Sequence, residues 1–99
     1  FLFKTYNSKR KINNLVLSYM SRDLSLYLKA GINLVKAVKL LKQRHEYDKK
    51  LSSFFDSIEA FLDEGKSFYN ALESQNVLKI PDFYIQSIKV SENGGLFQF

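Results

Sequence analysis

Apolar residues recur at intervals of three and four between positions 51 and 62, and this spacing limits the possible fold more than any other pattern in the chain. The set is Leu51, Phe54, Phe55, Ile58, Phe61 and Leu62. Such intervals return to one face of an α-helix. Asp48 precedes the set as a good N-cap, and Gly65 follows it as a terminator. The other face is Ser, Lys, Asp and Glu, which predicts a helix on the outside of a bundle with one buried side.

The segment from Asn14 to Lys29 has the same period but two apolar faces. One face carries Leu17, Met20, Leu24, Tyr27 and Leu28. The second lies roughly opposite and consists of Leu15, Tyr19 and Leu26. A one-sided surface helix needs only one apolar stripe. We therefore expect this helix either to be central, with neighbours on both sides, or to present its second face to another copy in a homodimer. Chain beyond Phe99 and the N-terminal segment are the other candidates to cover that face.

Glycine, proline and capping residues predict three further helices. Gly31 ends the first helix and Asn33 caps the next, Ser67 caps a short one, and Pro81 begins a last one that ends at residues 93–95. Their apolar positions are Leu34, Ala37, Val38 and Leu41; Phe68, Ala71 and Leu72; and Phe83, Tyr84, Ile85 and Ile88. Residues 74–79 lose the period, so we expect a loop there. Residues 96–99 resemble the first turn of a further element.

No run alternates apolar and polar residues over a strand length with hairpin turns around it, which excludes a substantial sheet. The predicted fold class is therefore all-α, an antiparallel bundle of about five to six short helices. With 99 residues the chain has room for one such domain.

The net charge of +5 is unevenly placed along the chain. Residues 1–13 carry Lys4, Lys9, Arg10 and Lys11 and no acidic residue, whereas residues 14–99 carry eleven basic and ten acidic side chains. We expect residues 1–13 to be a basic linker or flexible segment, and residues 14–99 to be the helical domain, truncated at its C-terminal end. The chain has no cysteine, which fits a reducing compartment, and no apolar run long enough to cross a bilayer.

Three local patterns occur in order along the chain. The first is the helix stop Ala30-Gly31-Ile32 with the restart Leu34-Val35-Lys36-Ala37-Val38; the second is Gly65-Lys66-Ser67-Phe68 followed by Ala71-Leu72; the third is Ile80-Pro81 followed by Ser91-Glu92-Asn93-Gly94-Gly95 and Phe97. Together they resemble, over about residues 20–97, the cytoplasmic domain of the platform proteins of type II secretion systems and type IV pilus machines, the secretion protein F family. Asn33 and Ser91 stand where that family usually has a proline and a glycine.

The resemblance implies a polytopic protein of the bacterial inner membrane with two copies of this helical domain, the present copy lying on the cytoplasmic side. It also implies a scaffold rather than an enzyme. Its partners would be the hexameric assembly ATPase and other inner-membrane components, in a machine for secretion, pilus assembly or competence. No small-molecule substrate, cofactor or metal is expected.

Exposed charges supply the candidate partner contacts. Lys36, Lys39 and Lys42, continued by Arg44, line the outer side of the second helix and are candidates for docking an acidic ATPase surface, with a plain solvated face as the alternative. Glu92 belongs to the third pattern. We expect it to hold the glycine-rich turn that follows, with a partner contact as a second possible role.

Two other groups of side chains were candidates for a cation or metal site, but their spacing does not favour one. The acidic set on the helix after Asp48 is Asp56, Glu59, Asp63 and Glu64. Alone it supplies too few oxygens for a calcium site, and we expect an exposed face, with a cation or basic-partner site shared across a dimer interface as the alternative. His45 is the only histidine, and at a helix end it is expected to be solvated rather than a metal ligand.

Two functional classes other than a scaffold have less support in the sequence. The short glycine turn before a helix with outward lysines also fits a helix-turn-helix nucleic-acid binder. Against this, residues 14–99 are near charge balance, and the outward positions of the second helix, Lys36, Lys39 and Lys42, are lysines rather than the Arg, Asn and Gln that usually read base edges. An enzyme has no nucleophile and base pair, metal set or cofactor loop in its favour.

Overall fold

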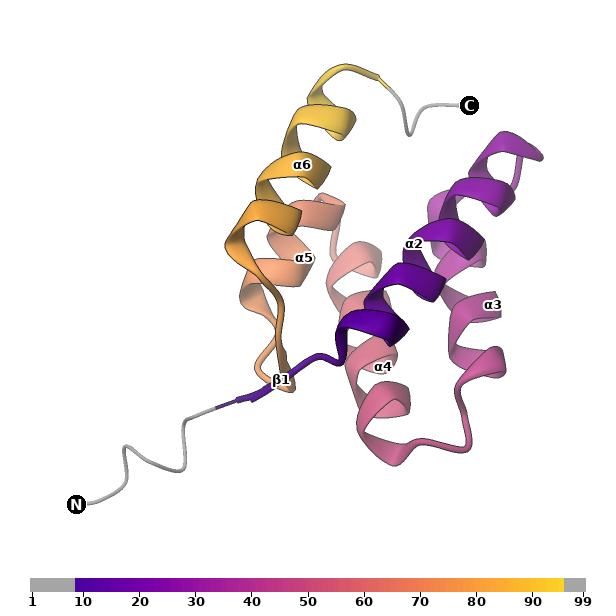
Figure 1. Ribbon diagram of the computed structural model, residues 1–99. Helices are drawn as coiled ribbons and strands as arrows, with labels where there is room; N and C mark the ends of the chain where they lie inside the picture. Colours follow the sequence, from indigo (N-terminus) through magenta and orange to yellow (C-terminus); the bar gives the residue numbers. More distant parts are fainter. Residues whose placement is uncertain (1–8, 96–99) are drawn as a thin grey trace.

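Five helices and two very short strands make up the described part of the chain, residues 9–95, in the computed structural model (Figure 1). In chain order they are β1 (Arg10–Lys11), α2 (Asn14–Lys29), α3 (Leu34–Arg44), α4 (Lys49–Asp63), α5 (Phe68–Ser74), β2 (Leu78–Lys79) and α6 (Asp82–Asn93). Each helix packs against the next one along the chain, so the all-α prediction is confirmed. The expected turn over residues 96–99 lies outside the described residues.

Local side chains account for where the helices begin. The Asn33 Oδ1 accepts the N–H of Lys36 at 2.9 Å, and the Asp48 Oδ1 accepts the N–H groups of Lys50 and Leu51 at 3.0 and 3.2 Å. The Ser67 Oγ accepts the N–H of Asn70 at 3.2 Å. These three N-caps were predicted, because a side-chain oxygen at that position satisfies a first-turn N–H that has no partner within the helix.

Two glycines end helices in the same way. Gly31 has φ +87° and Gly65 has φ +95°, a left-handed conformation that other residues rarely adopt. The N–H of Ile32 then bonds to the carbonyl of Tyr27, and the N–H of Lys66 to that of Phe61. These six-to-one bonds define Schellman motifs, and they turn α2 back towards α3 and α4 towards α5.

The core is centred on α4, whose residues Phe54, Phe55 and Ile58 are almost fully buried. On one side α4 packs against α3, and on the other it packs against α5 and touches β2. Its opposite face is polar, as predicted. Helix α4 therefore joins the α2–α3 pair to the α5–α6 pair, which Figure 1 shows on opposite sides of the domain. A hydrogen bond between the Ser21 and Tyr84 hydroxyls, 2.8 Å long, connects the two pairs directly.

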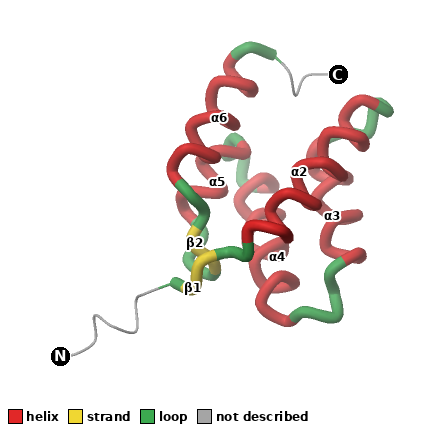
Figure 2. Tube along the Cα trace, viewed as in Figure 1, coloured by secondary structure: helices red, strands yellow, loops and turns green. Residues whose placement is uncertain are grey.

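Residues 74–79, expected to be a loop, contain strand β2. It pairs in parallel with β1, with Arg10 opposite Leu78 and Lys11 opposite Lys79 (Figure 2). The N–H of Ile12 continues the pairing to the carbonyl of Lys79, and the Ile12 side chain is buried in the core. The folded unit thus begins a few residues before position 14. Two-residue strands are too short to produce an alternating pattern, so the sequence carried no signal for them.

One predicted apolar position is exposed. Phe83 was assigned to the apolar set of the last helix, yet 71% of its surface is accessible. Ile85 and Ile88, three residues apart, face the core, and Phe83 falls on another side of α6.

Candidate interaction surfaces

The second apolar face of α2 is uncovered within the described residues. Leu15, Tyr19 and Leu26 are 59%, 45% and 56% exposed. The helix is therefore not central. The candidates that could cover this face are a second copy of the domain and a segment outside the described residues. Arg22 lies on the same stripe, with its guanidinium carbon 5.6 Å from the centre of the Tyr19 ring. We refer to Leu15, Tyr19, Arg22 and Leu26 as the α2 stripe.

The lysine row on α3 is partly neutralised by α4. Lys39 Nζ lies 3.6 Å from the Glu59 carboxylate, and Lys42 Nζ donates a hydrogen bond to Asp56. That hydrogen bond raises the pKa of Lys42 above its ordinary value. Lys36 remains exposed and makes no ion pair within residues 9–95. It lines a shallow groove at the start of α3, so the row offers one free cation rather than three.

These ion pairs weaken two alternative interpretations, a cation site on α4 and a helix-turn-helix nucleic-acid binder. Asp56 and Glu59 are matched with lysines, and no group of three potential metal ligands occurs among residues 9–95. A helix-turn-helix protein would direct the α3 lysines at phosphates, but Lys39 and Lys42 are directed at carboxylates of α4.

Glu92 has a structural role different from the expected one. Its carboxylate accepts the backbone N–H of Phe68 at 2.8 Å and that of Tyr69 at 2.9 Å, so it caps the N-terminus of α5 rather than the glycine turn beside it. Ser67 supplies the next acceptor. A carboxylate is favoured there because the N-terminal end of a helix carries partial positive charge. The Glu92 carboxylate already accepts hydrogen bonds from two backbone N–H groups. A contact between Glu92 and a partner stays a prediction.

The expectation of a solvated histidine is wrong. His45 ends α3 with only 7% of its surface exposed, and its ring stacks on that of Phe55 with centroids 6.0 Å apart. Neither ring nitrogen has a hydrogen-bond partner within the described residues. Burial and the neighbouring Arg44 lower the pKa of His45, against the opposing effects of Asp23 and Asp48.

Two buried polar residues were missed by sequence reasoning. Asp23 is 7% exposed and pairs with Arg44 at 3.1 Å, which connects α2 to the end of α3. Gln75 is 2% exposed, and its side-chain amide bonds to backbone groups of Leu72, Val77 and Leu78. An aspartate on the otherwise apolar buried face of α2 was the available signal for Asp23. Nothing in the sequence around Gln75 signalled its role.

The contact made by Glu92 unites two of the patterns on which the resemblance rests. The third pattern contributes the carboxylate, and the second contributes the two N–H groups that it caps. The model of the family described as type II secretion system (T2SS), protein F matches residues 20–97, which is 78 of the 99 residues. The chain belongs to this family.

The T2SS protein F family comprises platform proteins of type II secretion and type IV pilus machines, typically found in the inner membrane, and it is a family of scaffolds rather than of enzymes. No curated protein and no solved structure is similar enough to this chain to count as a match. Within residues 9–95, no helix combines the length and the apolar character needed to cross a membrane.

Proposed function

We propose that this chain is a cytoplasmic scaffold domain of an inner-membrane platform protein, which docks the assembly ATPase and other inner-membrane components of a secretion, pilus or competence machine. The observation that carries the proposal is the family match over residues 20–97. Two exposed features support it: the α2 stripe and the free cation at the start of α3.

Lys36 is the residue proposed to meet the ATPase. It is exposed and unpaired in the described part of the chain, beside the apolar side chains of Leu34 and Val35 in the same groove. An acidic surface would gain a charge contact there without breaking an internal ion pair. Reversing Lys39 or Lys42 would instead place a carboxylate against Glu59 or Asp56, so those variants would not separate binding from folding.

The test is the binding of the purified domain to the ATPase encoded in the same organism, measured by biolayer interferometry at low salt. Lys36→Glu is expected to weaken binding about tenfold, or ~1.4 kcal/mol. Lys66→Glu is the matched control, since Lys66 is an exposed lysine just beyond α4. Equal binding by the parent, Lys36→Glu and Lys66→Glu would show that Lys36 is not in the interface. The absence of binding by the parent would contradict the proposed docking of the ATPase.

The α2 stripe is proposed to pair with a second copy of the domain. Its four residues are spaced by four, three and four positions, which keeps them on one side of the helix. The stripe is also symmetric about its middle. If two α2 helices cross antiparallel, Leu15 faces the partner's Leu26, and Tyr19 faces the partner's Arg22. Apolar ends then meet apolar ends and each guanidinium meets a ring, so the stripe complements itself, as a two-fold interface requires.

Sedimentation of Leu26→Glu against the parent tests this pairing. The variant places a carboxylate against the partner's Leu15, and we expect it to shift the domain to the monomer. Glu is a good helix former, so α2 itself is not weakened. A parent that sediments as a monomer at every concentration would contradict the homodimer.

A further inference from the structure

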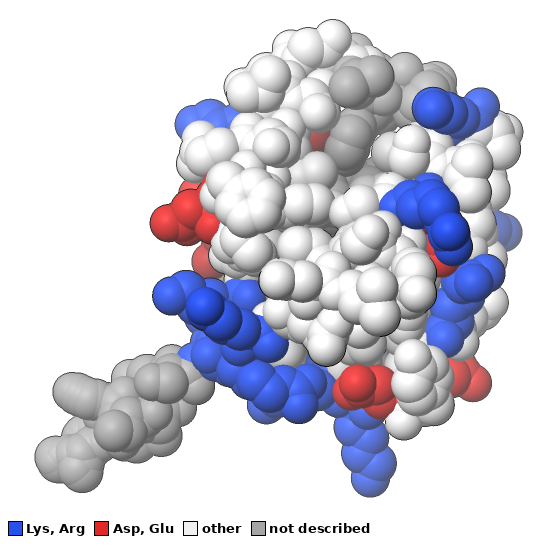
Figure 3. All heavy atoms as spheres, in the orientation of Figure 1, with Lys and Arg blue, Asp and Glu red and all other residues white. Residues whose placement is uncertain are grey.

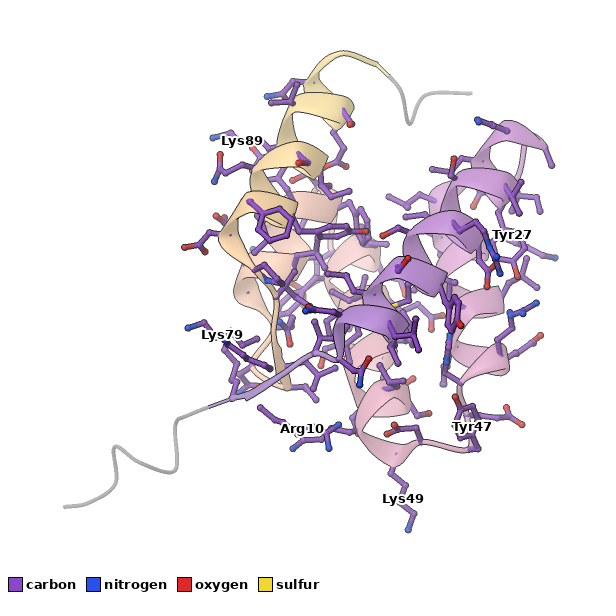
Figure 4. All side chains as sticks on the ribbon, in the orientation of Figure 1. Arg10, Tyr27, Tyr47, Lys49, Lys79 and Lys89 are labelled. Atoms are coloured by element: carbon purple, nitrogen blue, oxygen red, sulfur yellow. The ribbon has the colours of Figure 1, made fainter. Side chains whose placement is uncertain are left out.

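Unpaired positive charge gathers at the pair of strands rather than on α3. Arg10, Lys11 and Lys79 are exposed, and within residues 9–95 none of them makes an ion pair. Lys9 stands beside them and donates from Nζ to the backbone oxygen of Gln75 at 3.2 Å. The parallel pairing of β1 with β2 brings Lys79 next to Lys11, 68 positions away in sequence. Figure 4 shows the side chains of Arg10 and Lys79 extending outward at this edge.

An aromatic side chain borders the same cations. Lys11 and Lys79 line one groove with Ile12, Asn14, Pro81 and Phe83. This groove contains no acidic residue, and Phe83 is 71% exposed. A second groove, which also contains Lys9, Lys11 and Lys79, includes the carboxylates of Glu73 and Asp82. Lysines and arginines form a blue cluster below a mostly white area over α6 and α2 in Figure 3. We call Lys9, Arg10, Lys11, Lys79 and Phe83 the basic edge.

We propose that the basic edge rests on the anionic lipid headgroups of a bilayer. Lysine and arginine beside an anionic membrane each add to the attraction, and an exposed aromatic ring gains free energy by entering the boundary between headgroups and acyl chains. Residues 1–8 directly precede this edge in the sequence and have a similar basic and aromatic composition, with Lys4, Phe1, Phe3 and Tyr6. Because the family is one of inner-membrane proteins, a bilayer surface is available to the domain.

The lipid assignment is favoured over an acidic protein or a nucleic acid by the types of side chain that carry the positive charge. Three of the four are lysines, point charges that suit a fluid layer of phosphates, and only Arg10 has the planar fork suited to bidentate recognition. The proposal does not depend on ATPase docking, which was assigned to a different surface around Lys36.

The experiment is co-sedimentation of the 99-residue chain with vesicles of phosphatidylcholine alone and with vesicles that also contain phosphatidylglycerol. Binding is expected only to the anionic vesicles and is expected to weaken with salt. Each cation near an anionic surface contributes about fivefold to the partition coefficient, so Lys11→Gln with Lys79→Gln should weaken binding about 25-fold. Phe83→Ser should weaken it about tenfold through lost apolar contact.

A matched double variant controls for net charge. Lys36→Gln with Lys66→Gln also removes two positive charges, but from exposed positions outside the basic edge. We expect this variant to bind within about twofold of the parent, because salt screens charges that lie far from the membrane. Circular dichroism of each variant checks that the helices are intact. Equal loss in the two double variants would mean general charge attraction and would overturn the proposal. Failure to bind anionic vesicles while binding a single-stranded oligonucleotide or polyglutamate would overturn it in favour of that partner.

Discussion

Removal of the Glu92 carboxylate should destabilise the domain more than the loss of any other exposed or half-exposed acid. Helix α5 has only seven residues, and isolated helices of that length do not persist in water. Its first two N–H groups, from Phe68 and Tyr69, are bonded by Glu92 at 2.8 and 2.9 Å. In Glu92→Ala both donors lose a charged acceptor across the α5–α6 contact.

The magnitude follows from those two bonds. A hydrogen bond to a charged group contributes about 1.5–3 kcal/mol when buried, and Glu92 is only partly buried, so we take the lower end for each bond. Glu92→Ala should therefore cost about 3 kcal/mol, which in a domain of this size corresponds to a fall in Tm of about 12–24 °C. Glu92→Gln keeps one acceptor oxygen and should cost about half as much.

Thermal and urea unfolding followed by circular dichroism measures both losses. Glu73→Ala is the matched control: it removes an exposed carboxylate from α5 itself, for which no hydrogen bond or ion pair occurs within residues 9–95, and it should change stability by less than about 0.5 kcal/mol. Amide exchange at Phe68 and Tyr69 should speed up in Glu92→Ala. If Glu92→Ala and Glu73→Ala unfold alike, the cap does not hold α5 in place, and the structural link between the two sequence patterns is refuted.

Three further predictions concern a buried ring, a core side chain and an ion pair in the described part of the chain. His45→Phe should stabilise the domain by about 1–2 kcal/mol in urea unfolding near neutral pH, because two buried ring nitrogens without partners are replaced by apolar atoms against Phe55. Because the pKa of His45 is lowered in the folded state, the unfolded chain binds a proton more readily than the folded one, and the free energy of unfolding should fall as the pH drops below about 6.5. This pH dependence should be smaller in His45→Phe. Equal pH dependence in the parent and in His45→Phe would contradict the burial of the His45 ring. Ile58→Ala should cost about 2–5 kcal/mol in the same assay, since its side chain is 1% exposed, and a loss under about 1 kcal/mol would show that it is not in the core. Lys39→Glu combined with Glu59→Lys should restore part of the stability that Lys39→Glu alone loses, by up to about 1 kcal/mol, and an additive double variant would show that this exposed pair contributes nothing.

The helices could be read from the sequence because their signals are local. The period of Leu51 to Ile58, the cap at Asp48 and the stop at Gly65 all act within a few residues of one another. The pairing of β1 with β2 joins segments 68 residues apart through backbone groups, which every residue has, so no side-chain pattern reports it. Phe83 was misassigned because it lies beside half-buried Tyr84 and two positions before buried Ile85, so it looks like part of the same stripe.

The interaction surfaces were harder to predict than the helices. The exposure of Leu15, Tyr19 and Leu26 excludes a central position for α2, but it does not distinguish a second copy from another segment as the partner of this face. The lysine row on α3 was found by its spacing, but the sequence did not reveal that Glu59 and Asp56 of α4 neutralise two of its members. Glu92 was singled out by the resemblance, and its actual partner lies 24 positions away on α5. In each case the deciding fact is which helices are neighbours.

The proposal that this domain works by assembling with other subunits is tested most directly by disulfide cross-linking through α2, since the chain has no cysteine of its own. The antiparallel pairing predicts that Leu15→Cys/Leu26→Cys gives a covalent dimer on mild oxidation, because each cysteine faces the other position of the partner. Leu15→Cys alone and Leu26→Cys alone should form no covalent dimer, but the two variants should cross-link to each other when mixed. Dimers formed readily by either single variant alone would contradict the antiparallel pairing, and the absence of any cross-link in the double variant would contradict self-association through α2.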